Sequence, residues 1–218
     1  MPRTTRAAAL VSAAVLTMLL GGCGQEDPSG APVADVQVHD TDGMHGAVLP
    51  EPYDVPPVAL TATDGSTYRL DQDPQDPLTL VFFGYTHCPD ICQIVMADIT
   101  SALNRLDDAQ RQQVSMQFVT TDPQRDDPET LRAYLDRFDP EFGGLTGPLA
   151  KVVALGKPLG VHVSHGEKLP SGGYAVNHGT HVLGVRPDGT VPILWTEGTA
   201  PAKIADDIRT ILREGIPQ

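Results

Sequence analysis

The sequence predicts an α/β domain in which helices flank a central mixed sheet. Between residues 78 and 159, apolar strand-like runs alternate with longer segments of helical pattern, as in parallel strands joined by crossover helices. Two further strand-like runs, 180–186 and 190–195, are separated by the turn Pro187-Asp188-Gly189, which is typical of an antiparallel hairpin. Parallel and antiparallel strands are therefore expected in one sheet.

The elements follow one another in a definite order. The domain opens with an extended, proline-rich segment from Pro50 to Pro57 and a hairpin, 58–61 and 67–70, around the turn Asp64-Gly65. The remaining elements are predicted at 78–84 (strand), 90–106 (helix), 114–121 (strand), 128–138 and 148–159 (helices), 180–186 and 190–195 (strands) and 200–213 (helix). This is the element order of a thioredoxin-like fold.

Residues 1–22 are typical of a secretion signal. Arg3 and Arg6 precede an apolar segment, 7–20, which is shorter than a membrane-spanning helix requires. The segment ends in Leu20-Gly21-Gly22-Cys23, which resembles the bacterial lipobox, where cleavage before the cysteine accompanies lipidation of its sulfur. An ordinary signal peptide followed by an incidental cysteine is the alternative. We expect a lipid anchor on Cys23 that holds the protein on the extracytoplasmic face of the cell membrane.

Beyond the signal, residues 23–45 are small and polar without a period, which predicts a flexible tether. Residues 46–218 are long enough for one domain with a sizeable core.

The chain has a net charge of −13, and removal of residues 1–22 takes away two arginines and no acidic residue. A protein this acidic is not expected to bind nucleic acid or to adhere electrostatically to anionic lipid. We expect a monomer.

Two thiols lie where the predicted strand 78–84 gives way to the helix 90–106. The motif is Cys88-Pro89-Asp90-Ile91-Cys92, and a lipidated Cys23 leaves these two as a single pair. The N–H groups at the start of a helix, and its dipole, are expected to favour thiolate over thiol. A thiolate is both the nucleophile of disulfide exchange and a ligand for a soft metal, and the four-residue spacing suits either. From these residues alone, a redox disulfide and a metal site both stay open.

A metal site with two thiolates requires a third ligand, and the chain contains seven histidines. Five are weak candidates, because they lie in or beside the tether, next to a cysteine on an extended segment, or at a glycine-containing loop: His39, His45, His87, His162 and His165. The stronger candidates are His178 and His181. They are three residues apart on a predicted strand, so at most one of them is expected to face the cysteines.

The segment Phe83-Gly84-Tyr85-Thr86-His87-Cys88-Pro89-Asp90-Ile91-Cys92 resembles the signature of the Sco/SenC family. Members of this family are membrane-tethered, copper-binding proteins of thioredoxin fold that help to assemble cytochrome c oxidase. Other stretches match the family as well: 120–126, 144–147, and 174–178 followed by the turn Pro187-Asp188-Gly189. The resemblance extends from about Leu49 to the C-terminus.

The resemblance implies that Cys88, Cys92 and His178 bind copper, as Cu(I) or Cu(II). The spacing between His178 and the Pro187-Asp188-Gly189 turn favours this histidine over His181. Two thiolates and an imidazole select soft or borderline metals. Structural Zn(II) is disfavoured, because a fourth protein ligand is not evident in the sequence.

The implied function is that of a metallochaperone that delivers copper to the CuA site of cytochrome c oxidase subunit II. Another copper chaperone is an expected further partner, and the membrane is reached through the lipid anchor. The alternative is an enzyme, a thiol–disulfide oxidoreductase that reduces the oxidase CuA cysteines through a redox disulfide between Cys88 and Cys92. A peroxiredoxin-like peroxidase is disfavoured, because Thr86-His87-Cys88 lacks the Thr-x-x-Cys spacing.

Two acidic residues and one amide near these motifs bear on the prediction. Asp122 and Asp126 could support the metal site or a partner, but a loop held by Asp–backbone contacts and by Asp–Arg125 contacts is the favoured interpretation.

Asn177 stands where the family commonly has aspartate before the histidine. An amide raises imidazole basicity less than a carboxylate does, so the preference between Cu(I) and Cu(II) is not predicted.

Overall fold

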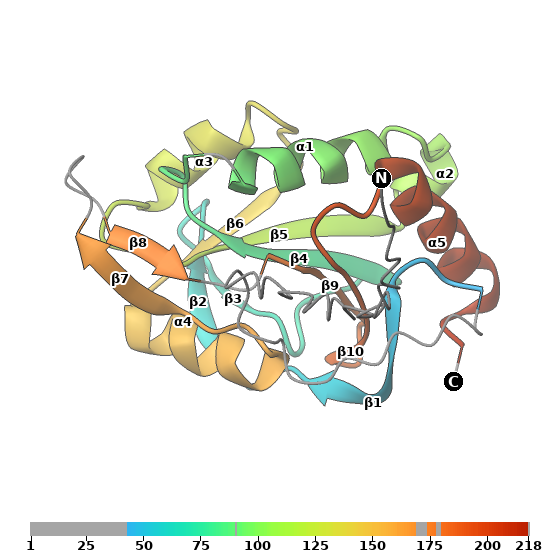
Figure 1. The fold of residues 1–218 in the computed structure, drawn as a ribbon, viewed down its shortest axis with the longest axis horizontal. Coiled ribbons are helices and arrows are strands. Elements are labelled where there is room, and N and C mark those ends of the chain that lie inside the picture. Colours follow the sequence, from blue (N-terminus) through green and yellow to red (C-terminus); the bar gives the residue numbers. More distant parts are fainter. Residues whose placement is uncertain (1–42, 90, 169–173, 178–179, 218) are drawn as a thin grey trace, which may run out of the picture. The chain divides into compact units, whose positions relative to one another are not determined.

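The computed structural model describes residues 43–89, 91–168, 174–177 and 180–217. Its main sheet has eight strands in the order β1-β10-β9-β4-β5-β6-β2-β3, while β7 and β8 form a separate two-stranded sheet (Figure 1). The strands are β1 (Ala47–Asp54), β2 (Ala59–Ala62), β3 (Thr67–Arg69), β4 (Leu78–Gly84), β5 (Val114–Thr120), β6 (Gly143–Thr146), β7 (Ser164–Lys168), β8 (Tyr174–Asn177), β9 (Val182–Val185) and β10 (Thr190–Trp195). The helices are α1 (Ile91–Leu103), α2 (Asp108–Arg111), α3 (Pro128–Leu135), α4 (Leu149–Gly156) and α5 (Pro201–Glu214), with a 3₁₀ turn at Lys157–Leu159.

Strand β4 lies in the middle of the main sheet. It pairs in parallel with β5, ending with Gly84 opposite Thr120. On its other side it pairs antiparallel with β9, where Phe82 is opposite Val182. Because β5 in turn pairs in parallel with β6, the carboxyl ends of three parallel strands meet at one edge of the sheet.

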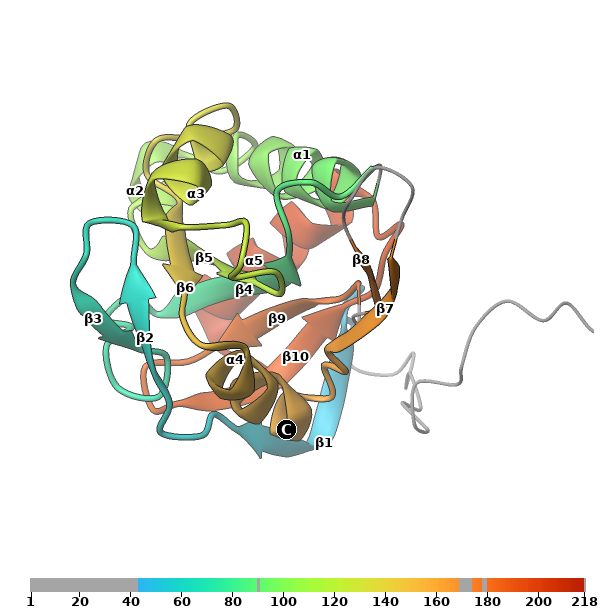
Figure 2. The same cartoon turned by 90° about the vertical axis from the view of Figure 1, so that its left-hand side faces the viewer.

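Both faces of β4 are covered. Leu80 and Phe82 belong to the core under α1, α3 and α5, whereas Val81 and Phe83 belong to the core on the α4 side. Figure 2 shows α1 and α3 on one side of the sheet and α4 on the other. This two-sided burial explains why β4 has a continuous apolar sequence instead of an alternating one.

The predicted fold class is confirmed, since helices flank a mixed sheet. Strand β4 has the predicted bounds, and the predicted hairpin is the β2–β3 pair, which joins the sheet beside β6. Helices α1 and α3 end earlier than predicted, at Leu103 and Leu135, and turns follow each of them. The predicted helix 148–159 is α4 continued by the 3₁₀ turn.

Several strands were not predicted as such. Strand β1 includes Pro50 and Pro52, which an edge strand tolerates, and its register against β10 shifts between Val48 and Tyr53. Strand β6 is short and begins with two glycines. Strands β7 and β8 pair with each other. The predicted strand 180–186 is wrong at its start, since β9 begins at Val182.

The segment that enters β1 is attached to α5 through a buried carboxylate. Asp207 accepts hydrogen bonds from the backbone N–H groups of His45, at 2.9 Å, and Gly46, at 2.8 Å. It also accepts one from Trp195 Nε1 at 2.7 Å. Met44, just before these residues, is already buried. The three hydrogen bonds compensate the Asp207 carboxylate for its removal from water. Two of them come from the backbone just before β1, so they fix the place where the chain enters the sheet.

The predicted signal peptide, Cys23, and the tether up to residue 42 lie outside the described residues. Within the part of the chain that is described, no helix has both the length and the apolar character needed to cross a membrane.

We expect Asp207→Asn to lower the free energy of unfolding by about 2 kcal/mol. One carboxylate oxygen that now accepts hydrogen bonds from N–H groups would be replaced by an amide nitrogen, which cannot accept them. The matched control is Asp206→Asn on the same helix. The Asp206 ion pair with Arg209 lies at the surface, so this change should cost less than about 0.5 kcal/mol. Urea unfolding followed by circular dichroism measures both, and equal losses would contradict the role assigned to Asp207.

Candidate metal centre

The cysteine motif begins where β4 leaves the sheet at Gly84. A Cβ atom on this residue would lie 2.9 Å from two ring atoms of Phe118, so the packing requires glycine here. The Gly84 carbonyl accepts hydrogen bonds from the backbone N–H of Thr121, at 2.7 Å, and from its Oγ1, at 3.0 Å. The chain therefore departs from the sheet at a fixed point and turns toward α1.

Cys88 and Cys92 meet at the first turn of α1. The backbone N–H of Cys88 donates to the Tyr85 carbonyl at 3.2 Å, which closes a tight turn before the helix. The backbone N–H of Cys92 donates to Cys88 Sγ at 3.4 Å. The Cys88 sulfur thus accepts one of the N–H groups that have no partner within a helix at its N-terminus. Both thiols are buried, with exposed fractions of 4% for Cys88 and 0% for Cys92.

Cys92 belongs to the hydrophobic core as much as to the motif. It lies on the face of α1 that packs against the sheet, together with Val95, Met96 and Ile99. Its hydrogen bond with Cys88, its burial, and the negative charges of Cys88 and Asp126 raise the pKa of the Cys92 thiol. The prediction of a helix-favoured thiolate is therefore wrong for Cys92. A metal ion that binds Cys92 must displace a proton.

Tyr85 adds a third polar group to the thiols. Burial, followed by the negative charge of a Cys88 thiolate and a hydrogen bond with Cys88, raises the pKa of Tyr85 to about 12. The side chain is buried and stays a neutral phenol at physiological pH. The sequence motif contains this tyrosine, but its contact with the thiols was not predicted.

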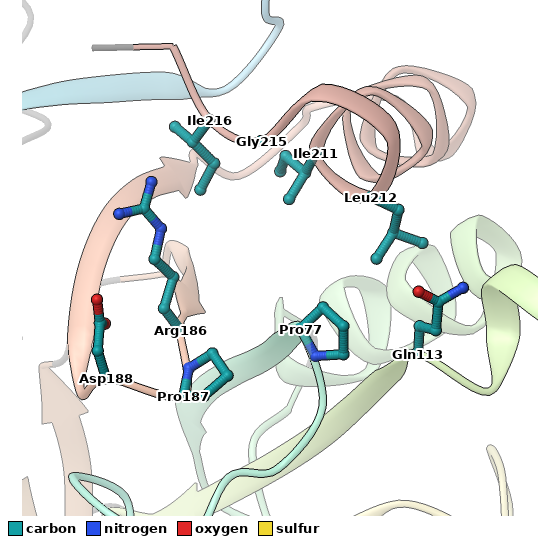
Figure 3. A pocket seen from close by; sticks show the side chains of 9 residues that line it. All are labelled: Pro77, Gln113, Arg186, Pro187, Asp188, Ile211, Leu212, Gly215 and Ile216. Atoms are coloured by element: carbon teal, nitrogen blue, oxygen red, sulfur yellow. The ribbon is translucent and has the colours of Figure 1, made fainter.

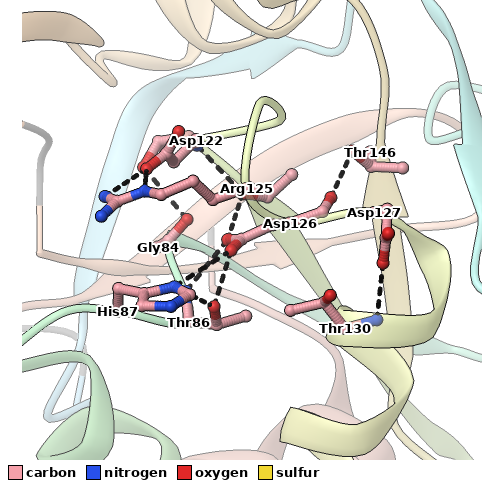
Figure 4. Close-up of polar contacts among 11 residues, drawn as sticks. Gly84, Thr86, His87, Asp122, Arg125, Asp126, Asp127, Thr130 and Thr146 are labelled. Carbon is pink, nitrogen blue, oxygen red and sulfur yellow. Dashed lines mark hydrogen bonds and ion pairs between the residues drawn. The ribbon is translucent and has the colours of Figure 1, made fainter. Parts of the chain in front are cut away.

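A second buried carboxylate holds the loop between β4 and α1 (Figure 4). Asp126 Oδ2 accepts from the backbone N–H of Thr86 at 2.9 Å and from Thr120 Oγ1 at 2.7 Å. Its Oδ1 accepts from Thr86 Oγ1 at 2.6 Å. The Asp126 carbonyl accepts from Thr146 Oγ1 at 2.9 Å. This residue thus connects the cysteine loop to β5 and β6.

Asp122 has a local role instead. It forms an ion pair with Arg125, whose Nε donates to Asp122 Oδ2, and its backbone N–H donates to Thr120 Oγ1 at 3.0 Å. The predicted Asp–Arg125 contact of this loop is confirmed for Asp122. Asp126 differs, because its side chain reaches a residue 40 positions earlier in the chain, and no local pattern indicates such a contact.

The histidines are distributed as follows. His178 lies outside the described residues, as does His39. His181 is buried and comes directly before β9, whose Val182 pairs with Phe82 near the end of β4. It therefore lies near the same edge of the sheet as the cysteines, outside a strand and not within one as predicted. Among the described residues, no group of three or more His, Cys, Asp and Glu side chains is arranged to hold a metal ion.

Three of the other histidines, His45, His87 and His162, have exposed side chains. His87 is exposed and turned toward the Asp126 network: its Nδ1 lies 2.9 Å from Thr86 Oγ1 and 3.8 Å from Asp126 Oδ1. His162 is exposed, and the His45 side chain is exposed as well, although the His45 backbone is held by Asp207. His165 lies in β7. The β8 strand ends at Asn177, immediately before His178.

A cavity of about 460 Å³ lies elsewhere in the fold (Figure 3). Its lining includes Pro77, which precedes β4, and Gln113, which precedes β5, together with Arg186 and Ile211. It therefore lies at the amino ends of β4 and β5, whereas the cysteines follow the carboxyl end of β4. Ligands of open α/β sheets bind outside the carboxyl ends of the strands, which favours the cysteine edge as the functional site.

The SCO1/SenC family model matches residues 53–213. A mitochondrial SCO2 homolog of Danio rerio is 36% identical over 135 residues, which are 62% of this chain and 48% of that protein. ScoI of Bradyrhizobium japonicum with copper bound has a TM-score of 0.61 at 27% identity, covering 73% of this chain and 96% of that one. Apo Sco1 of Thermus thermophilus has a TM-score of 0.69 at 29% identity, covering 79% and 99%. The chain spans about half the length of the curated relatives it matches.

The two thiols should differ in accessibility. We expect the variant that retains Cys88 (Cys92→Ser) to react with a bulky aromatic disulfide at least about tenfold faster than the variant that retains Cys92 (Cys88→Ser), because the Cys92 side chain is enclosed in the core. Both variants also carry Cys23→Ser. In guanidinium chloride the two rates should converge. Equal rates in the folded protein would contradict the burial of Cys92.

Proposed function

The chain belongs to the SCO1/SenC family, and we propose that it binds copper through Cys88, Cys92 and His178 and delivers it to the CuA centre of cytochrome c oxidase subunit II. The Sco family is one of cytochrome c oxidase assembly proteins. The observation that carries the proposal is the close placement of two thiols at the first turn of α1, where the Cys92 amide contacts Cys88 Sγ at 3.4 Å.

The donor set suits copper as cargo. Two thiolates and one imidazole bind Cu(I) or Cu(II) in preference to hard cations. Because the raised pKa of Cys92 keeps its proton on the sulfur, metal uptake releases that proton and release of the metal takes one up. Three protein ligands leave a coordination position that a ligand of the recipient can enter, so the ion can pass by stepwise exchange.

The surroundings of the thiols are consistent with transfer through direct contact. Cys88 and Cys92 are buried, which limits their access to water and oxidants. The neighbouring His87, Gln93 and Ile94 side chains are exposed, and Ile94 has an exposed fraction of 54%. A recipient that approaches the start of α1 therefore meets a surface of mixed polar and apolar character beside the buried sulfurs.

The proposal includes the location of the protein. Residues 1–22 act as a lipoprotein signal, Cys23 carries the lipid, and residues 23–45 tether the copper-binding domain, 46–218, to the extracytoplasmic face of the cell membrane. In this arrangement the domain acts as a monomer near a membrane-embedded oxidase and receives copper from another chaperone.

A thiol–disulfide oxidoreductase is the second candidate. The contact between Cys88 and Cys92 that favours a shared metal also brings the thiols close enough to form a disulfide after a small adjustment of the turn. In that reaction the two thiols lose two electrons and two protons, which reduce a disulfide between the recipient cysteines to two thiols.

The experiment that tests the proposed function is an anaerobic copper titration of the reduced full chain, with Cys23→Ser, in detergent. We expect one equivalent to bind to the wild-type site and to His181→Ala and His162→Ala, with thiolate-to-copper absorption. His178→Ala should bind with at least about tenfold lower affinity, because one of three ligands is lost. Cys88→Ser should abolish the absorption, because a hydroxyl is a poor ligand for copper.

The outcome also separates the two candidates. Tight stoichiometric copper retained by Cys88→Ser would refute the ligand assignment. Disulfide-reductase activity that persists in His178→Ala, with no stoichiometric copper in the wild-type site, would favour the oxidoreductase. Loss of copper in His181→Ala alone would transfer the role of third ligand from His178 to the histidine before β9.

A further inference from the structure

We propose that Asp126 and Thr86 form a clamp that positions the cysteine loop for copper binding, with Asp126 as a positioning residue that contacts no metal itself. The inference rests on the proposed copper-binding function and extends it to residues outside the ligand set. It assigns a role to a charged side chain that is fully buried in the fold.

The first argument is the number of hydrogen bonds to Thr86. Asp126 accepts from both hydrogen-bond donors of this residue, from the backbone N–H with Oδ2 at 2.9 Å and from Oγ1 with Oδ1 at 2.6 Å. Thr86 lies two positions before Cys88, in the short connection between the end of β4 and α1. Two bonds from one carboxylate fix both the position and the orientation of this residue, and thereby the path of the chain into Cys88.

The second argument is that Asp126 is itself held by the sheet. Thr120 Oγ1, at the carboxyl end of β5, donates to Asp126 Oδ2 at 2.7 Å. Thr146 Oγ1, at the end of β6, donates to the Asp126 carbonyl at 2.9 Å. Figure 4 shows the carboxylate of Asp126 directed toward Thr86 and His87, with Thr146 contacting the backbone of Asp126. The clamp therefore ties the cysteine loop to the ends of two strands.

The third argument concerns cost. A carboxylate removed from water is unfavourable unless its hydrogen bonds compensate, and an apolar residue would fill this position at lower cost. Two of the hydrogen bonds that the Asp126 carboxylate accepts come from Thr86, which lies between β4 and α1 and belongs to neither element. Metal sites whose surrounding hydrogen bonds hold the ligands in place lose affinity when those bonds are removed.

The test compares Thr86→Val with Thr86→Ser in the full chain with Cys23→Ser, in detergent. Valine has the shape of threonine but lacks the hydroxyl, whereas serine retains it. We expect the Cu(I) dissociation constant, measured by competition with a chromophoric chelator, to rise about tenfold in Thr86→Val and to stay within about twofold of wild type in Thr86→Ser. Asp126→Ala should weaken binding further, unless it prevents folding.

The control for general loss of stability is Asp207→Asn. It alters the other buried carboxylate, whose partners are His45, Gly46 and Trp195 and not the cysteine loop. This variant should unfold at lower urea concentration with an unchanged dissociation constant. An equal rise in dissociation constant for Thr86→Val and Asp207→Asn would overturn the proposal, and so would unchanged binding by Thr86→Val.

A measurement without metal separates this inference from the proposed function. The amide of Cys88 donates to the Tyr85 carbonyl within the clamped loop, so its hydrogen exchange should be about tenfold faster in metal-free Thr86→Val and unchanged in Asp207→Asn. If wild type binds no copper while this exchange responds as expected, the copper proposal fails and the clamp remains a property of the loop. If wild type binds copper and the exchange does not respond, the clamp is wrong.

Discussion

The burial of strand β4 on both faces is the constraint on which the position of the cysteines depends. Each of its residues is enclosed between the α1 side and the α4 side, so the strand has no freedom to shift in register. It ends at Gly84, where a side chain would collide with Phe118 and where the carbonyl is held by Thr121. From this fixed point the chain reaches the first turn of α1 in a few residues, and both thiols are placed as a result.

Cys92 shows how closely the core and the candidate site are combined. Its side chain packs beside Val95 and Met96 on the buried face of α1, and the same burial contributes to the raised pKa of its thiol. The N-terminus of a helix favours thiolate, but the contact with Cys88 and the low polarity of the core outweigh it here. The metal-free site therefore retains a proton at Cys92, and a metal ion that binds both sulfurs replaces that proton.

The elements with strong local patterns were predictable from the sequence, and those that depend on distant partners were not. The apolar run 78–84 identifies β4 without reference to the rest of the chain. By contrast, β6 begins with two glycines and is a strand because it pairs with β5 and β2. Strand β1 contains two prolines, which normally exclude a central strand and are accommodated at this edge by an irregular register. The ligand assignment at His178 is still a prediction, since that residue lies outside the described part of the chain.

The two buried carboxylates explain why the role of Asp126 could not be predicted. Asp207 accepts the amides of His45 and Gly46 at the entry to β1, and Asp126 accepts the amide of Thr86 between β4 and α1. In both places backbone N–H groups lie outside a helix or sheet ladder and still need an acceptor when buried. The acceptor comes from a segment far away in sequence, so a pattern read along the chain finds only the local contacts of each aspartate. The position of a connecting segment in this fold is therefore determined by tertiary hydrogen bonds as much as by the strands and helices on either side of it.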